Sequence, residues 1–324
     1  MSEYQYYEFQ AIDRPFTEEE RAEIGTWSSR TTPTSTHAIF MYNYGDFPHE
    51  VKKVVEKYFD AMLYLTNWGT KRLMFRLPRT MVDTKTLQPF CSFEGVRLSN
   101  TKHHLILDMC FDDEEGGGWV DGEGWLSSLI TLRNDLINGD LRTLYLAWLH
   151  SIKQEYDLKA SLQELEPPVP EGLRNLTASL KSFIDFFEID RDLISAASQA
   201  SNKKQSESRT IGELLNAAKK LADQRKQKHR QKERQERIKR ITELTKQEPE
   251  LWKKVFQLIA LRQPKAYDQA VDILKQLREV SEHLEQVDRF NATIEQIHQD
   301  NSSLSGLKSR LNRAGLASKS SARR

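Results

Sequence analysis

The sequence contains little cysteine and no long apolar run. Cys91 and Cys110 are the only cysteines among 324 residues, and their spacing is not that of paired metal ligands. This excludes a disulfide framework or a cysteine zinc site built from this chain alone, and it is typical of a reducing compartment. No window approaches the roughly 18 consecutive apolar residues of a membrane helix, and the first residues lack a signal-peptide pattern. We therefore expect a cytoplasmic protein without a membrane partner.

Common catalytic signatures are also missing. The sequence has no P-loop, no GxGxxG dinucleotide motif, no HExxH metal motif and no GxSxG nucleophile turn. We expect no cofactor, and the chain favours an interaction protein over an enzyme. An active site assembled from scattered carboxylates, such as Asp108, Asp112 and Asp121, would leave no spacing signature of this kind.

The two ends of the chain carry opposite charge, although the net charge is only +1. Positions 1–200 hold 20 Lys and Arg against 31 Asp and Glu, whereas positions 201–324 hold 28 against 16. Such an asymmetry predicts an acidic partner at the basic end, nucleic acid above all. The leading hypothesis is a non-enzymatic adaptor whose basic C-terminal half binds nucleic acid or an acidic partner, while its N-terminal domain binds a protein.

The positive charge is concentrated at positions 219–240, which hold 11 Lys and Arg against three acidic residues. Residues 223–237 include no apolar side chain, so they predict a helix that is polar on every side, with cations pointing in all directions. A duplex beside this helix would meet roughly three or four of them through phosphate contacts. The absence of interleaved aromatic residues weakens a model of single-strand stacking.

Two other interpretations of this basic run stay open. It is also typical of a solvated helix that spaces two units, and of a helix that docks on an acidic protein surface, the front half of this chain included. The candidate residues for binding nucleic acid or an acidic partner are Lys219, Lys220, Arg225, Lys226, Lys228, Arg230, Lys232, Arg234, Arg237, Lys239 and Arg240.

An acidic, glycine-rich loop covers residues 112–123. Its carboxylates make Asp112, Asp113 and Asp121 candidate ligands of a divalent cation, and a metal-dependent hydrolase or nuclease is the alternative function that follows. The spacing does not fit the twelve-residue calcium loop, and a solvated connection explains the loop equally well. A third interpretation is a protein-contact loop that uses Trp119 and Trp125 as anchors.

The hydrophobic pattern predicts an α+β fold, with an N-terminal mixed-sheet domain, a helical hairpin and an all-α C-terminal region that contains a long basic helix. Thr17 and Glu20 form the sequence pattern of a capping box. Apolar residues from Val51 to Met62 recur at helical spacing, and residues 72–77 alternate as in a strand. Phe90 to Leu98 and His103 to Phe111 are predicted as two more strands.

These elements suggest six segments along the chain. We expect an α+β domain, a helical extension packed on it, a linker, a long basic helix, a small helical module and a disordered basic tail, at residues 1–115, 116–197, 198–209, 210–247, 248–316 and 317–324. A structural oligomer, in which the long helix pairs with a second copy, is a further alternative. The polar stretch lacks the apolar a and d positions of a coiled coil, which argues against such pairing there.

Several short motifs carry a resemblance to bacterial proteins: YNYGDF at 42–47, KYFDA at 57–61, NWGT at 67–70 and EGWLSSL at 123–129. Together they resemble an uncharacterised bacterial family, and this resemblance implies no activity. QPKAYDQA at 263–270 and LNRAGL at 311–316 are similar to the C-terminal helical segment of some bacterial SWIM zinc-finger proteins. The zinc finger itself is absent, so the resemblance implies a shared partner-binding end and no zinc.

Overall fold

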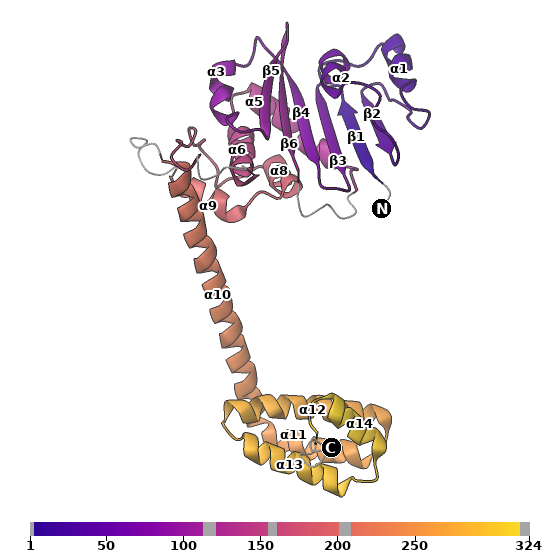
Figure 1. Ribbon diagram of the computed structural model, residues 1–324, viewed down its shortest axis with the longest axis vertical. Helices are drawn as coiled ribbons and strands as arrows, with labels where there is room; N and C mark the ends of the chain where they lie inside the picture. The colour runs from indigo at the N-terminus through magenta and orange to yellow at the C-terminus, as the bar shows by residue number, and fades with distance from the viewer. Residues whose placement is uncertain (1–2, 113–120, 155–160, 201–208, 318–324) are drawn as a thin grey trace. The chain divides into compact units, whose positions relative to one another are not determined.

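The computed structural model describes residues 3–112, 121–154, 161–200 and 209–317 (Figure 1). The chain divides into two compact units, Met1–Asp223 and Gln224–Arg324. The boundary falls inside one helix, α10, which covers Ile211–Lys246. None of the helices in the described ranges combines the length and the apolarity that a membrane span requires.

The first unit is built on a six-stranded sheet in the order β2-β1-β3-β4-β6-β5. The strands are β1 (Gln5–Gln10), β2 (His37–Tyr42), β3 (Ala61–Thr66), β4 (Lys71–Pro78), β5 (Val96–Asn100) and β6 (His104–Phe111). Every adjacent pair is antiparallel. The α+β class is therefore confirmed, and the prediction of a mixed sheet is wrong.

The helical connections explain this error. A helix between two strands suggested a crossover and hence a parallel pair. Helix α2 (Val51–Tyr58) does connect two strands of the same direction, β2 and β3, but β1 lies between them and pairs with both. Helix α1 (Glu18–Gly25) connects β1 to β2, which are antiparallel neighbours.

Local patterns are confirmed at the start of α1 and corrected at the end of α2. Thr17 and Glu20 form the predicted capping box, with the Thr17 hydroxyl accepting from the Glu20 N–H at 3.2 Å. The apolar stripe that begins at Val51 does not continue as helix to Met62. The helix ends at Tyr58, and Met62 belongs to β3, where it is buried against α2.

Helices cover both faces of the sheet. Alternate residues of β4 point to opposite cores: Leu73 and Phe75 to one, Met74 to the other. The core that contains Met74 is closed by α1 and α2. The larger core, with Leu73 and Phe75, is closed by helices that include the predicted hairpin (Figure 1). They are α4 (Trp125–Leu129), α5 (Thr131–Ile137), α6 (Arg142–Gln154), α8 (Ala178–Phe187) and α9 (Arg191–Ala200).

Short helices and chain connections complete the first unit. Helix α3 (Thr84–Leu87) and the 3-10 turn η1 (Gln88–Phe90) precede β5. Of the strand predicted from Phe90 to Leu98, Phe90 belongs to η1, residues 92–95 form bends and turns, and the strand begins only at Val96. Of the predicted linker, residues 198–200 belong to α9 and residues 201–208 lie outside the described residues.

The second unit is helical. After the end of α10 it contains α11 (Glu248–Ala260), α12 (Pro264–His283), α13 (Val287–Asp300) and α14 (Ser305–Arg313). Leu274, Phe290 and Leu311 lie in its core. His298 Nε2 lies 2.8 Å from the carbonyl oxygen of Leu316, which ties the end of the described chain to α13. Of the predicted tail, only Ala317 is described.

Candidate nucleic-acid interface

The central part of α10 is exposed on every side. Residues 223–240, here called the basic segment, are 18 consecutive exposed helical residues. They include nine Lys and Arg and three acidic residues, with Ile238 as their one apolar side chain. At about 1.5 Å per residue the basic segment is roughly 27 Å long. It is exposed because nothing in its sequence before Ile238 gains free energy by burial.

The side chains of the basic segment are sorted by helical face. With 100° between successive residues, four glutamines and Ile238 fall on one face, which we call the glutamine row. A cationic row lies on each side of it, roughly 75–110° around the helix. The glutamine row is Gln224, Gln227, Gln231, Gln235 and Ile238; the arginine-rich row is Lys226, Arg230, Arg234 and Arg237; the lysine row is Lys228, Lys232 and Lys239. Arg225 and Arg240 lie outside both rows, so the cations point to every side of the helix except that of the glutamine row.

Carboxylates of the basic segment avoid the glutamine row. Glu233 and Glu236 lie on the opposite side of the helix, where Glu233 pairs with His229 at 3.4 Å and Glu236 with Lys232 at 3.8 Å. Arg240 forms a 2.7 Å ion pair with Glu279 of α12. Such exposed pairs contribute little free energy and break readily when a stronger anion approaches.

Most cations of the two rows have no carboxylate partner. Within the described ranges, no ion pair involves Lys226, Lys228, Arg230, Arg234, Arg237 or Lys239. The candidates Lys219 and Lys220 are also exposed, about one turn before the basic segment. They belong to the first unit, where Leu214 and Ala218 of the same helix are buried in the larger core.

The start of α10 is fixed to the first unit by a buried polar cluster, which we call the α10 anchor. Arg209 donates from Nε and Nη2 to the two Glu166 oxygens at 2.6 and 2.7 Å, and the Tyr145 hydroxyl donates to the same carboxylate. Burial, reinforced by the Glu166 charge, raises the pKa of Tyr145 far above its usual value, so the phenol keeps its proton. Backbone hydrogen bonds join residues 162–166 to residues 209–212. The helix therefore begins at a defined place on the first unit.

The described carboxylates Asp112 and Asp121 of the acidic loop each have a hydrogen-bond partner of their own. Asp112 accepts from the Thr70 hydroxyl at 2.6 Å, and Asp121 accepts from the N–H of Glu123 at 3.1 Å. Asp113 and Trp119 lie outside the described residues. Trp125 is half-buried against Phe186, with 5.2 Å between ring centroids. Over the described part of the chain, no three His, Cys, Asp or Glu side chains are grouped so as to hold a metal ion.

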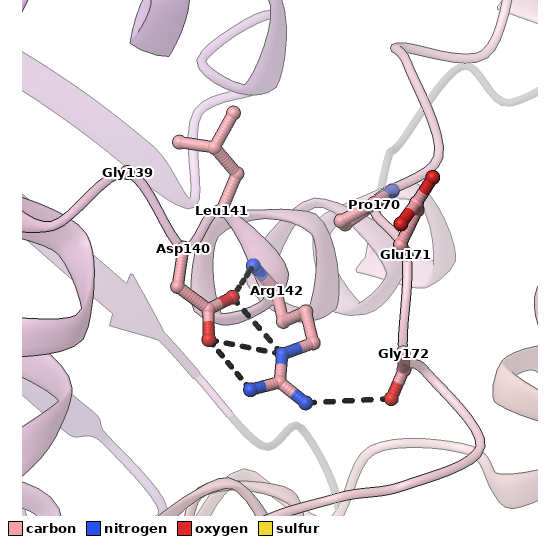
Figure 2. A pocket seen from close by; sticks show the side chains of 7 residues that line it. All are labelled: Gly139, Asp140, Leu141, Arg142, Pro170, Glu171 and Gly172. Carbon is pink, nitrogen blue, oxygen red and sulfur yellow. Dashed lines mark hydrogen bonds and ion pairs between the residues drawn. The ribbon is translucent and has the colours of Figure 1, made fainter.

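An open hollow of about 540 Å³ lies beside the start of α6 (Figure 2). Figure 2 shows the Arg142 guanidinium turned toward Asp140 and toward the Gly172 carbonyl. The Asp140 ion pair is 2.6 Å long, and Nη1 donates to the carbonyl oxygens of Asn175 at 3.0 Å and Gly172 at 3.4 Å. This cation is neutralised by its own surroundings, so the hollow is a structural junction between α6 and the loop at 170–175.

A second buried charge cluster was not foreseen from the sequence. Asp60 is fully buried and accepts from Arg76 at 2.8 and 3.0 Å and from the backbone N–H groups of Ile12 and Asp13. Arg133, with 2 % of its side chain exposed, contacts Asp60 at 3.4 Å and Asp13 at 2.7 Å. This cluster joins α5 to β4 and to the chain after β1. Every charge in it is paired, so its role is structural.

The two cysteines are poor nucleophiles. Burial raises the pKa of Cys91 to about 11 and that of Cys110 to about 11. Both groups are therefore protonated thiols at neutral pH, and the thiolate is the reactive form of cysteine. Neither thiol is a candidate for covalent catalysis.

Comparison of the chain with known protein families, with curated proteins and with solved structures found no match. The resemblances to an uncharacterised bacterial family and to the helical segment of SWIM zinc-finger proteins stay predictions. A functional proposal therefore depends on the geometry and charge of this chain alone.

Proposed function

We propose that this protein is a nucleic-acid-binding adaptor and that the basic segment of α10 is its binding surface. The observation that carries the proposal is the continuous exposure of this segment, together with a glutamine row and two cationic rows among which Asp223, at the first position of the segment, is the one carboxylate. Phosphates release condensed counterions when lysine and arginine contact them, which is the main source of sequence-independent affinity for nucleic acid.

The distribution of charge favours binding over a purely solvated spacer. A helix that needs only solubility gains most from cations and carboxylates at i and i+4 spacing, which stabilise one another. Here one such pair, Lys232 with Glu236, is present, while the arginine-rich row, Lys228 and Lys239 are without carboxylate partners in the described ranges. This surplus of unpaired cations attracts a polyanion.

The structural-oligomer hypothesis has less support. A coiled coil through the basic segment would bury the row that faces the partner helix, and that row contains glutamines or cations in place of apolar a and d residues. Cations of two copies would also repel one another along the seam. A polyanion meets the same surface without either cost.

The first test compares two triple substitutions that remove equal charge. In the full chain, K228Q/R230Q/K232Q alters the basic segment, whereas K253Q/K254Q/K265Q alters exposed lysines of α11 and α12. We expect the first variant to bind a labelled 20-base-pair DNA duplex at least tenfold more weakly than the unaltered protein, because about three phosphate contacts are lost. The second variant should stay within threefold. Fluorescence anisotropy at about 0.1 M salt measures both.

Equal losses in the two variants would show that only net charge matters, and the basic segment would not be the binding surface. Circular dichroism verifies that the helices persist, because glutamine has nearly the helix propensity of lysine and arginine. If neither DNA nor RNA binds at low salt while an acidic protein does, the basic segment is a protein-docking helix and the proposal is wrong.

A further inference from the structure

We infer that the basic segment enters the major groove of a B-form DNA duplex, with the glutamine row facing the base edges and the two cationic rows contacting the phosphates of opposite strands. This inference rests on the proposed function and adds the class of nucleic acid and the orientation of the helix. The observation that carries it is the order of rows around the helix, arginine-rich, glutamine and lysine, with Glu233 and Glu236 on the far side and Asp223, at the first position of the segment, beside the arginine-rich row.

The size of the basic segment suits this groove. An α-helix with its side chains is about 10–12 Å across, and the major groove of B-DNA is about 12 Å wide. The basic segment is exposed on all sides for about five turns, so its side chains are accessible to the walls of a groove. A helix in this position has base edges in front of it and a phosphate strand on each side.

The side chains of each row match the part of the DNA, base edges or phosphates, that the row would contact. Glutamine is a donor and an acceptor at once and forms paired hydrogen bonds with N6 and N7 of adenine. Ile238, which extends the glutamine row, is 42 % exposed and can contact a thymine methyl group. The cations at the sides reach phosphates. Glu233 lies opposite the glutamine row, and Glu236 would exchange its contact with Lys232 for solvent when Lys232 contacts a phosphate.

The same features argue against other nucleic acids. The major groove of A-form RNA is deep and narrow, so side chains cannot read it. Single strands are usually held by stacking on aromatic rings, and the basic segment has none. B-form DNA is therefore the ligand that uses all three rows together.

The salt dependence of binding distinguishes a helix inserted in the groove from a helix that contacts the duplex through one cationic row only. For B-DNA, the slope of log K against log salt is about −0.9 per phosphate contact. We compare K226Q/R230Q/R234Q, which removes cations of the arginine-rich row, with K228Q/K232Q/K239Q, which neutralises the lysine row. If both rows contact the duplex, each variant should flatten the slope by about 2 to 3 relative to the unaltered chain, whose own slope should be steeper than about −5.

A third variant, Q227A/Q231A/Q235A, keeps the charge and tests whether the glutamine row contacts the base edges of the major groove. It should lose at least fivefold in affinity for an A·T-rich DNA duplex and keep the slope of the unaltered chain, because only base contacts are removed. The unaltered protein should bind this DNA at least tenfold more tightly than the RNA duplex of the same sequence.

The outcomes distinguish the two proposals. One pattern of results would overturn the groove inference and leave nucleic-acid binding standing: only one of the two row variants changes the salt slope, and RNA and DNA duplexes bind equally. The helix would then lie along one phosphate backbone. If no nucleic acid binds to the unaltered chain, both fail. An unchanged affinity of the glutamine variant contradicts base contact by that row.

Discussion

Replacement of Asp60 by asparagine is expected to lower the free energy of unfolding of the first unit by about 3–5 kcal/mol. Asp60 is the only full counter-charge of buried Arg76 and one of two carboxylates around Arg133 in the described structure. Asparagine can still accept hydrogen bonds, but it leaves a positive charge without compensation in a site that water does not reach. Urea unfolding followed by tryptophan fluorescence measures the effect, because five of the six tryptophans lie in the first unit.

Asp13 provides a matched control for this substitution. It contacts the same Arg133 side chain, but 43 % of its own side chain is exposed, so water replaces much of what D13N removes. We expect D13N to cost about 1 kcal/mol or less. A loss of similar size in D13N and D60N would contradict the account, because burial of the carboxylate would then not decide the energetics.

Asp60 also predicts how the first unit responds to acid. Burial acts to raise the pKa of this carboxyl, but the N–H groups of Asp13 and Ile12 and the Arg76 guanidinium outweigh it, and the pKa lies below its usual value. A lowered pKa contributes stability above the unfolded-state value of about 3.9, and this contribution is lost as pH falls toward the folded-state pKa. The first unit should therefore lose stability below about pH 4 with a steeper slope than D60N.

The second large effect is expected at the α10 anchor. E166Q removes the counter-charge of Arg209, and we expect a loss of about 3 kcal/mol, since Glu166 has only 3 % of its side chain exposed. Part of this lost stability should be confined to the start of α10, because backbone hydrogen bonds hold residues 209–212 to residues 162–166. Amide hydrogen exchange at 209–214 should accelerate at least tenfold, while exchange within the sheet of the first unit should change much less.

Glu164 is the control for the anchor. It lies two residues from Glu166 in the same segment, but its side chain is exposed, so E164Q should leave exchange at 209–214 within twofold. If E166Q behaves like E164Q, the anchor does not position α10. Neither substitution touches the basic segment, so affinity for nucleic acid measured with E166Q tests whether a fixed helix start matters for binding.

Local patterns predicted much of the fold. The Thr17 and Glu20 capping box and the alternation at residues 72–77 are recognisable because neighbours in the sequence produce them. Strand β3 was missed because Phe59 and Met62 fit a helical stripe as well as a buried strand. Strand direction was wrong because nothing in the connection from β2 to β3 indicates that β1 lies between them.

The candidate interface was easier to predict than the buried clusters. Exposure of the basic segment follows from its near lack of apolar residues, and its rows follow from the helical period of 3.6 residues per turn. Asp60, Arg76 and Arg133 meet only because β3, β4 and α5 pack together. No spacing rule connects residues so far apart in the chain, and the Glu166 and Arg209 pair was hidden for the same reason.

The most direct test of nucleic-acid binding is a titration of the unaltered full chain with a labelled 20-base-pair DNA duplex at several salt concentrations between about 50 and 200 mM. The proposal predicts binding that weakens linearly on a log–log plot, by roughly a thousandfold over this range if about six phosphates are contacted. Binding that is undetectable at 50 mM salt, or that does not change with salt, would contradict it.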